Sequence, residues 1–541
     1  MKAPAFLIAF ATALVRVALA APAAALPDDP EGWHAVRTPH FILYTDAAPE
    51  RSYEIAASLA RFRAVFAQLA PSLELISPAP TKMLAFRDAE SYSPYKTDPD
   101  PRVLGQFLSH PDGNYLTLDA GARQVGSFAV IYHEYVHYFV RHNFPAVPRW
   151  FNEGLAEYYS TFAVEESRAV LGRPVERHVR WLRRHGNFSL SEVVQANRRW
   201  PEEHGGAGQR YAVSWALVHY LLSGSTQRLE RTADYLLRLE TGEDPERAFE
   251  EAFDLRLSTL EDELRDYVLG GDFPQAAIAL ERLPAPAIEA ELMRPADVLF
   301  HLGDLLSHIR RSAEAESHFH AALDFDGEHP EAHAGLALVR DHHARLDEAE
   351  VLYRDAVRLG STDPLTYLLY GRHLLRVGDR QAGRAREMLR RAVELDDGYG
   401  EGWALLGAAH LAADADPVRG IRSLQRARRL LPNRMDLVFY QAQLHARNAE
   451  PEPAHALVEG ILALRADPEL VDRARSEVER LNLLRAADDA FERQDSEEGL
   501  RLFDEAVSVT VDPALRQQME LQLLELQQLW TGTPAPSSSE P

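Results

Sequence analysis

The feature that most constrains the fold is a small residue that recurs at nearly constant intervals in the second half of the chain. Gly303, Ala337, Gly371 and Gly407 are separated by 34, 34 and 36 residues. Downstream of each lies a second set with a small, a large and a small side chain: Ala315/Phe319/Ala322, Ala349/Tyr353/Ala356, Ala385/Leu389/Ala392 and Gly420/Leu424/Ala427. Small residues at a helix contact, with a large one a turn away, let paired helices approach closely. The pattern predicts stacked helix pairs.

A period near 34 residues with this pattern resembles the tetratricopeptide repeat. The resemblance is strong across residues 296–432 and fades beyond them. We expect an all-α tetratricopeptide-repeat solenoid over residues 280–531, with a concave surface that recruits a protein partner. An irregular helical bundle is the alternative, which the matched spacings disfavour.

The chain before the repeats has a different pattern. The whole chain has 541 residues, which is more than one hydrophobic core supports, so a second domain is expected. Apolar runs predict strands at residues 41–45, 82–86 and 114–118. Helical spacing follows the strands or lies between them at residues 51–69, 128–140, 151–163 and 211–222. We therefore predict an α+β domain over residues 31–275.

The two ends of the chain are predicted to lie outside these domains. Residues 1–25 begin with Lys2, continue in a short apolar run, and offer Ala18-Leu19-Ala20 as a signal-peptide cleavage site. We expect the mature protein to be exported, periplasmic or extracellular, with no stable membrane span. A disordered or weakly anchoring N-terminus is the alternative, because Arg16 interrupts the apolar run. Residues 532–541 are rich in Pro and Ser, which predicts a disordered tail.

Charge and cysteine content exclude several functions. The formal net charge of −24 repels phosphate backbones and anionic lipid, so we expect no nucleic-acid partner. The absence of cysteine excludes disulfides, cysteine nucleophiles and thiolate zinc sites. Any metal must therefore be held by His, Asp or Glu side chains.

The motif that carries chemistry is His133-Glu134-Tyr135-Val136-His137. Two histidines four residues apart on a helix project from one face and can share one Zn²⁺ ion. Glu134 lies about 100° further around the helix, where it can face an attacking water molecule. The alternative to a zinc site is an exposed helix face that has polar residues at this spacing.

A catalytic zinc also needs a third protein ligand and an open coordination position. Pro145 and Pro148 end the first helix, so a second helix can return against it with Glu153 and Glu157 on one face. We assign Glu153 to the metal. We assign Glu157 to a second shell, where it accepts a hydrogen bond from a ligand histidine and fixes its tautomer.

These residues and Tyr211-Ala-Val-Ser-Trp-Ala-Leu-Val-His-Tyr220 resemble the gluzincin metallopeptidases of the peptidase-MA-like group. The resemblance covers roughly residues 33–222 and implies a zincin-like fold. It places the third zinc ligand at Glu153, the histidine-supporting acid at Glu157, and the oxyanion-stabilising tyrosine at Tyr211. The spacing between His137 and Glu153 is shorter than in thermolysin or aminopeptidase N, so the linking loop must differ.

The resemblance implies a zinc-dependent endopeptidase. Zinc activates water and polarises the scissile carbonyl, Glu134 acts as general base, and Tyr211 donates a hydrogen bond to the oxyanion. Gluzincins also offer an edge strand for an extended peptide substrate. We predict this role for Asn114, Tyr115 and Leu116, since their strand precedes the zinc helix in sequence; an internal strand is the alternative.

Two other functions stay open from the sequence alone. The chain could be a repeat-based protein-interaction adaptor whose peptidase fold is inactive. It could also be a zinc hydrolase that acts on a non-peptide amide, such as a cell-wall bond. The intact set His133, Glu134, His137 and Glu153 favours the peptidase over the adaptor.

Overall fold

The computed structural model describes most of the 541-residue chain: residues 26–69, 77, 79–98, 100, 103–122, 127–144, 147–165, 168–186, 188–195, 207–223, 225–240, 243–280, 287–413, 415–432, 434–448, 450–463, 468–511 and 513–531. The predicted signal peptide (1–25) and the predicted disordered tail (532–541) lie outside the described residues. Within the described residues, no helix combines the length and the apolar character needed to cross a bilayer.

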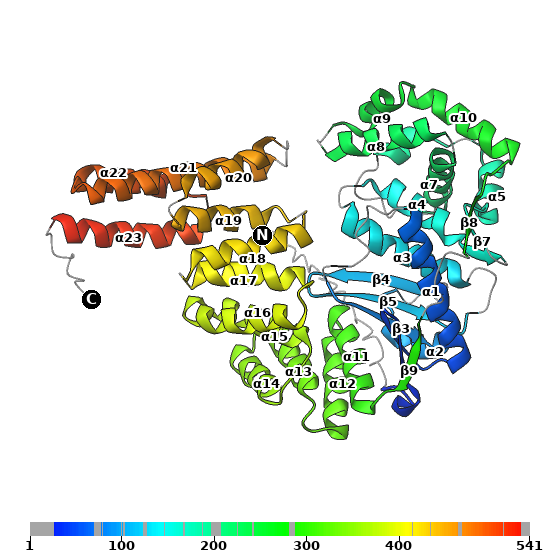
Figure 1. Cartoon of the computed structure of the whole chain (residues 1–541), viewed down its shortest axis with the longest axis horizontal. Coiled ribbons are helices and arrows are strands. Elements are labelled where there is room, and N and C mark those ends of the chain that lie inside the picture. Colours follow the sequence, from blue (N-terminus) through cyan, green and yellow to red (C-terminus); the bar gives the residue numbers. More distant parts are fainter. Residues whose placement is uncertain are drawn as a thin grey trace, which may run out of the picture.

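The N-terminal domain is built on a six-stranded mixed sheet with the order β4-β5-β3-β2-β1-β9 (Figure 1). Its strands are β1 (His34–Arg37), β2 (Ile42–Thr45), β3 (Thr81–Phe86), β4 (Gly105–His110), β5 (Gly113–Asp119) and β9 (Glu289–Leu292). β2, β3 and β5 run parallel, whereas β4, β1 and β9 pair antiparallel to their neighbours. The strands predicted at residues 41–45, 82–86 and 114–118 are confirmed as β2, β3 and β5.

Both faces of this sheet are covered, because alternate residues of a strand point to opposite faces. Leu116 and Met83 join a core with α1 (Pro49–Leu69) and α3 (Ser127–Asn143). Tyr115 on the opposite face joins a core with α11 (Pro295–His308). Burial on both faces explains why β5 is buried along its whole length.

The remaining helices and strands of the N-terminal domain follow the sheet. The helices are α2 (Ala89–Tyr92), α4 (Arg149–Ser160), α5 (Glu176–Arg184), α6 (Leu190–Gln195), α7 (Ala207–Leu222), α8 (Thr226–Glu240), α9 (Pro245–Phe253) and α10 (Leu257–Gly270), with 3₁₀ turns η1 (Pro30–Gly32) and η2 (Ser93–Tyr95). A second, three-stranded sheet has the order β6 (Ala163–Glu165), β7 (Arg168–Leu171) and β8 (Ala276–Ala279). The α+β class predicted for this region is confirmed.

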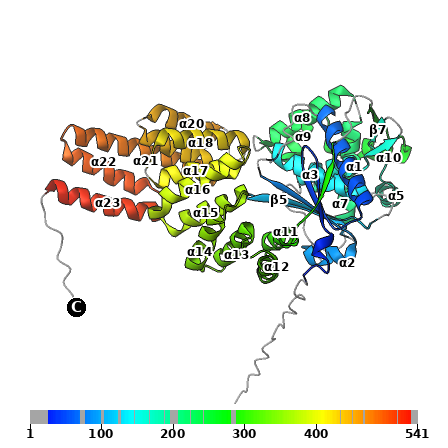
Figure 2. The same cartoon turned by 60° about the horizontal axis from the view of Figure 1, so that its bottom comes forward.

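The C-terminal region is all-helical (Figure 2). Its helices are α11, α12 (Ser312–Phe325), α13 (Pro330–His342), α14 (Leu346–Arg358), α15 (Pro364–Val377), α16 (Ala382–Leu395), α17 (Gly400–Ala412), α18 (Pro417–Leu430), α19 (Asp436–Arg447), α20 (Pro451–Ala463), α21 (Pro468–Glu492), α22 (Ser496–Val509) and α23 (Pro513–Thr531), with η3 (Asp379–Gln381) before α16. From α11 to α18 the helices have 13 or 14 residues each, as a regular helical-hairpin repeat requires.

The recurring glycines lie where paired helices touch. A Cβ atom at Gly371 would lie 2.5 Å from Leu389 Cγ, and one at Gly407 would lie 2.4 Å from Leu424 Cγ. Both distances are shorter than carbon atoms tolerate, so the small residue permits the helix contact. The helix-pair repeat predicted from the spacing is therefore confirmed.

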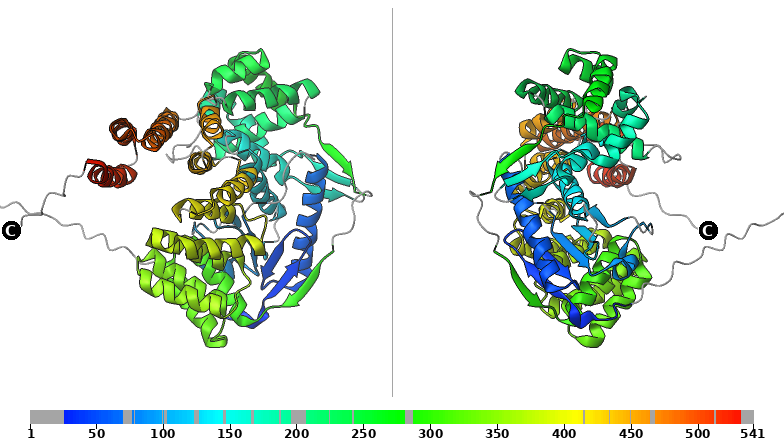
Figure 3. Two further views of the ribbon diagram at one scale, coloured as in Figure 1. Left: turned by 60° about the vertical axis from the view of Figure 1, so that its left-hand side comes forward. Right: turned by 90° about the vertical axis from the view of Figure 1, so that its right-hand side faces the viewer.

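The domain boundary lies further along the chain than predicted. The sequence placed it between residues 275 and 280, but β8 pairs with β7 and β9 pairs with β1. Figure 3 shows the green strand β9 beside the blue strand β1. The N-terminal domain thus continues to Leu292, because two short strands return to its sheets before the repeats begin.

The prediction that residues 114–116 form an edge strand is wrong. Asn114, Tyr115 and Leu116 belong to β5, which is internal because β4 pairs on its outer side. The Asn114 side chain donates to Ser77 Oγ at 3.0 Å, and Tyr115 Oη donates to Asp304 Oδ2 at 2.7 Å. These side chains are committed to contacts inside the protein, and the edge of the sheet next to the site is β4.

Candidate metal centre

Three side chains from two helices converge on one point. His133 and His137 project from α3, and Glu153 projects from α4. The two histidine Nε2 atoms are 3.1 Å apart, and Glu153 Oε2 lies 3.5 Å from His133 Nε2 and 3.4 Å from His137 Nε2. The structure therefore brings together the three residues that the sequence assigned to a metal.

The size of this triangle matches a small divalent cation. Ligand atoms about 2.1 Å from a tetrahedral Zn²⁺ ion lie about 3.4 Å from one another. The three observed separations of 3.1, 3.4 and 3.5 Å fall around that value. A point about 2 Å from all three atoms then lies just above their plane, which leaves a fourth position open.

Glu153 carries a polar atom that the protein leaves unsatisfied. Its Oε2 atom is buried and accepts no hydrogen bond from any described residue. Burial raises the pKa of Glu153, but the neighbouring imidazoles of His133 and His137 outweigh burial and hold that pKa well below its ordinary range. Burial lowers the pKa of His137, and Glu153 raises it, to about 8. The site attracts positive charge, as a site for a metal cation should.

The outer nitrogens of both histidines face fixed acceptors. His137 Nδ1 lies 3.0 Å from Asn152 Oδ1, and a proton on Nδ1 leaves the Nε2 lone pair for a metal. His133 Nδ1 lies 3.9 Å from Glu157 Oε1, on the side predicted for the second-shell carboxylate. Asn152 was not assigned a role from the sequence. Its place directly before Glu153 was the available signal, but the direction of its amide depends on how α4 returns.

Glu157 is itself held in place. Arg177 Nη2 donates to both of its oxygens at 2.8 and 3.0 Å, and His178 Nε2 lies 3.2 Å from Oε2. Burial raises the pKa of Glu157, but His178, His133 and Arg177 together lower it to about 2. Glu157 therefore stays ionised, and α5 positions it through Arg177 and His178.

Gly154 explains how α4 and α7 come so close. A Cβ atom there would lie 2.3 Å from the backbone oxygen of Ser214 and 2.6 Å from Val218 Cγ2. Backbone atoms cannot move away cheaply, so the glycine of the Asn152-Glu153-Gly154 motif is required for this helix contact. The contact brings Tyr211 on α7 towards Glu153.

Tyr211 lies within the electrostatic reach of the cluster. Burial raises its pKa, and the charges of Glu153 and Glu157 raise it further against the effect of Arg149, to about 12. The phenol therefore keeps its proton at neutral pH and can donate a hydrogen bond. The oxyanion-stabilising role that the sequence resemblance gave to Tyr211 stays a prediction.

Glu134 joins the cluster to the edge of the sheet. Its Oε2 atom accepts a hydrogen bond from the backbone N–H of Phe107 on β4, at 3.0 Å. Burial raises the pKa of Glu134, partly offset by the charges of His133 and His137. A carboxylate with a raised pKa holds a proton more readily, as a group that accepts and then returns a proton must.

The edge strand beside the site is β4, and its outward backbone groups are the ones that an added strand could pair with. Asp119 N donates to Leu104 O, and hydrogen bonding alternates along an antiparallel pair. Gly105, Phe107 and Ser109 are therefore the β4 residues whose backbone groups point away from β5. The bond from Phe107 N to Glu134 shows that this free edge faces the site.

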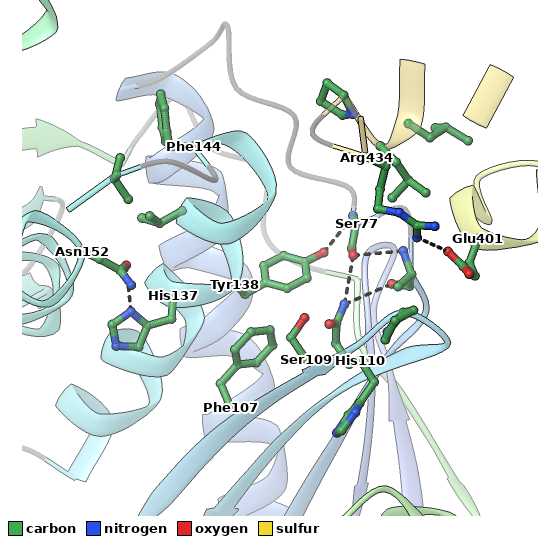
Figure 4. Close-up of a pocket in the computed structure, with 18 of the residues that line it drawn as sticks. Ser77, Phe107, Ser109, His110, His137, Tyr138, Phe144, Asn152, Glu401 and Arg434 are labelled. Atoms are coloured by element: carbon green, nitrogen blue, oxygen red, sulfur yellow. Dashed lines mark hydrogen bonds and ion pairs between the residues drawn. The ribbon is translucent and has the colours of Figure 1, made fainter. Parts of the chain in front are cut away.

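A cleft of about 640 Å³ extends from the candidate metal cluster, formed by His133, His137 and Glu153, along β4 to the repeat domain (Figure 4). Its lining residues come from both domains: Ser77, Ala79, Phe107, Ser109, His110, Pro111, Asn114, His137, Tyr138, Val140, Phe144, Val147, Asn152, Glu153, Glu401, Leu430, Leu431, Pro432 and Arg434. Figure 4 shows His137 and Asn152 on one side and Glu401 and Arg434 on the other. The repeat domain thus forms one wall of the cleft that contains the cluster.

Comparison with known families matches one part of the chain. A family described as "Protein of unknown function (DUF1570)" matches residues 127–239. This stretch contains the three candidate ligands, Glu134 and Tyr211, but the description assigns them no activity. No curated protein matches the chain.

Solved structures similar to the chain include helical-repeat proteins. One is described as "YrrB: a TPR protein with an unusual peptide-binding site", with 21% identity, 33% of this chain and 91% of that chain covered, and a TM-score of 0.30. Pseudomonas aeruginosa pilF has 19% identity, 42% and 97% coverage, and a TM-score of 0.29. MamA from Desulfovibrio magneticus RS-1 has 16% identity, 31% and 94% coverage, and a TM-score of 0.27. At such low TM-scores, the repeat architecture rests on the chain's own helix pairs.

Proposed function

We propose that this protein is a zinc-dependent endopeptidase whose helical repeats bind a protein substrate or partner. The observation that carries the proposal is the triangle of His133 Nε2, His137 Nε2 and the unsatisfied Glu153 Oε2, at separations that suit one Zn²⁺ ion. The pattern of residues 1–25 favours action outside the cytoplasm.

Each residue of the site has a distinct part in the proposed reaction. A bound Zn²⁺ ion would supply Lewis acidity to water and to the scissile carbonyl. Glu134 takes the proton of the attacking water and passes it to the leaving amine. The Tyr211 hydroxyl donates a hydrogen bond to the oxygen on which negative charge develops. Asn152 and Glu157 keep the two histidine rings oriented.

The free edge of β4 fits the backbone of an extended peptide. The Phe107 N–H already donates to Glu134, so a peptide added along this edge would pair with the Phe107 carbonyl and the backbone groups of Ser109, and it would lie in the cleft. Apolar side chains from both domains also line the cleft: Val140, Phe144, Val147, Leu430 and Leu431. We therefore expect a preference for peptides with apolar side chains at alternate positions.

The test compares zinc content and hydrolysis in two forms of the protein. The purified chain should hold one zinc per molecule and cleave members of a mixed peptide library, followed by mass spectrometry. Glu134→Gln should keep the zinc and lower the cleavage rate by roughly 10²–10⁴-fold, because it removes the proton acceptor. Equal rates for the two forms would sink the mechanism.

A second candidate function is a protein-interaction adaptor with an inactive peptidase fold. The observation that favours it is the long helical-repeat region, from Pro295 to Thr531, since stacked helix pairs form extended binding surfaces. A chain that takes up no stoichiometric zinc, and that leaves the library uncut, would favour the adaptor. Zinc uptake with cleavage of muropeptides alone would instead favour a non-peptide amide as substrate.

A further inference from the structure

A second cavity lies wholly on the repeat domain. It is a groove of about 820 Å³ lined by α16, α17, α18 and the turns between them. Its residues are separate from those of the metal cluster and of the cleft beside it. The groove therefore needs its own explanation.

The groove is basic in a strongly acidic protein. Its lining contains six arginines and three carboxylates, Glu387, Asp397 and Asp416, so its formal charge is positive, whereas the whole chain carries −24. The arginines are Arg386, Arg390, Arg419, Arg422, Arg426 and Arg429. Helix α18 contributes four of them and contains no acidic residue over Pro417–Leu430.

The spacing of the α18 arginines forms a stripe on one face of the helix. Arg419, Arg422, Arg426 and Arg429 follow one another at intervals of three, four and three residues, which keeps them on one side. Like charges at this spacing repel, and the repulsion costs the helix stability unless an anion screens it. A stripe of this kind is therefore a disadvantage to the isolated domain.

Three of the six arginines have no counter-charge among the described residues. Arg426 donates to Asp397 at 2.6 Å, Arg419 lies 3.2 Å from Asp416, and Arg390 lies 3.6 Å from Glu394. Arg386, Arg422 and Arg429 form no ion pair with any described carboxylate. Among the described residues, then, three guanidinium groups point at one groove without a partner.

The floor of the groove also has features of a binding site. Trp403 and Leu406 supply apolar surface, and Trp403 Nε1 donates to the backbone oxygen of Asp397, which fixes the ring. His410 is 6% exposed, and its Nδ1 atom has no hydrogen-bond partner within the described residues. A lining that combines apolar surface with charged side chains suits a peptide segment.

We propose that this groove binds an acidic segment of a partner polypeptide. Aspartate or glutamate side chains would pair with Arg422, Arg429 and Arg386, and an apolar side chain of the same segment would rest on Trp403. A nucleic acid fits less well, because the net charge of −24 opposes its approach and three carboxylates lie in the groove itself. The proposal is independent of the chemistry at His133, His137 and Glu153.

The test is a binding titration with the full-length protein and a chelator present, so that hydrolysis plays no part. The probe is a fluorescein-labelled dodecapeptide, three repeats of Glu-Ala-Glu-Leu, followed by fluorescence anisotropy. Its counterpart has Gln at every Glu position. The acidic peptide should bind with a micromolar dissociation constant, and the Gln peptide at least about tenfold more weakly, since the paired charges are gone.

The matched variants place the binding on the groove. Arg422→Glu/Arg429→Glu should weaken binding of the acidic peptide by about tenfold or more. Arg358→Glu/Arg475→Glu, which reverses two arginines that are 67% and 68% exposed elsewhere on the repeats, should leave it unchanged. Equal binding of both peptides, absence of binding, or equal loss in both variants overturns the proposal. Tighter binding of a single-stranded DNA dodecamer, lost in the groove variant, overturns it in favour of a nucleic acid.

Discussion

Two buried clusters of histidine and carboxylate side chains lie on opposite faces of the same sheet, and they differ in how their charges are balanced. At the metal cluster, Glu153 Oε2 faces two imidazole rings and accepts no hydrogen bond from the described chain. At the boundary between the domains, Asp304 accepts hydrogen bonds from Lys82 Nζ at 2.6 Å and from Tyr115 Oη at 2.7 Å. The Asp304 carboxylate is thus paired within the protein, whereas Glu153 keeps an oxygen that could contact a cation.

The boundary cluster extends this balance to its neighbours. His308 Nδ1 lies 2.9 Å from Tyr115 Oη, and its Nε2 lies 3.3 Å from Asp112 Oδ1. Arg372 donates to Asp112 Oδ2 at 3.0 Å. Lys82, Arg372 and His308 thus surround two aspartates, and none of these five side chains lines the cleft. The two clusters share residue types, and what distinguishes the candidate metal site is an unsatisfied carboxylate oxygen beside the cleft.

The largest expected effect is on the boundary cluster. Asp304→Ala leaves the Lys82 ammonium buried without its partner and should lower the free energy of unfolding by about 3–5 kcal/mol. Denaturant unfolding measures the loss, and zinc content should not change. The double variant Lys82→Met/Asp304→Leu should regain part of the stability, because the Lys82 ammonium is no longer buried without Asp304. Loss of zinc in Asp304→Ala would contradict the separation of the two clusters.

At the metal cluster, His137→Ala should mainly affect zinc. Structural zinc binding supplies about 10–16 kcal/mol over four ligands, so loss of one ligand should weaken affinity on the order of 10²–10³-fold. Competition with a chromophoric chelator measures this. The histidine control is His308→Gln at the boundary, which should bind zinc like the unchanged protein. If both variants lose zinc equally, the metal is not held where we place it.

A smaller effect on zinc binding is expected from Asn152, which contacts a candidate ligand and not the metal position itself. Asn152→Ala removes the acceptor for His137 Nδ1 and should weaken zinc binding by roughly 10–100-fold. Asn152→Asp keeps an acceptor at the same place and should retain most of the affinity. The same chelator competition distinguishes the two, and an identical loss in both would show that the amide acts through packing alone.

The smallest expected effect is a pH dependence at the boundary. Burial lowers the pKa of His308, but Asp304 and Asp112 raise it above its ordinary value. Its stabilising contribution is therefore complete below about pH 6.5, the unfolded value, and is lost as the pH rises through the higher folded pKa. Unfolding free energies measured from acid to alkaline pH, with a chelator present, should fall less steeply over that window in His308→Gln. Parallel curves would show that His308 is neutral throughout.

Much of the site could be predicted from the sequence because its signals are local. The spacing of His133 and His137 fixes their common face on any helix, and the prolines before Glu153 mark where a second helix can begin. The proposed ligand set therefore required no knowledge of the sheet. The same holds for the repeats, whose period records which residues touch the next helix.

The failures came from contacts between distant segments. β4 was missed because Gly105-Gln-Phe-Leu-Ser-His110 shows no clear alternation, yet it is the strand that borders the site. The hairpin of β4 and β5 places the earlier strand outside, so β4 and not the predicted segment of β5 forms this edge of the sheet. The roles of Asn152 and Gly154 depend on the angle at which α4 meets α3 and α7.

The sequence by itself determined the helix-pair repeats, the α+β class of the first domain and the residues able to hold a metal, because short-range spacing specifies each of them. Only the tertiary structure decided that Glu153 keeps an unmet oxygen, that β4 is the free edge, and that Glu401 and Arg434 of the repeats close the same cleft. It also gathered the arginines of α16 and α18 on one groove. These properties arise where packing brings together residues far apart in the chain, and spacing along the sequence does not record such distances.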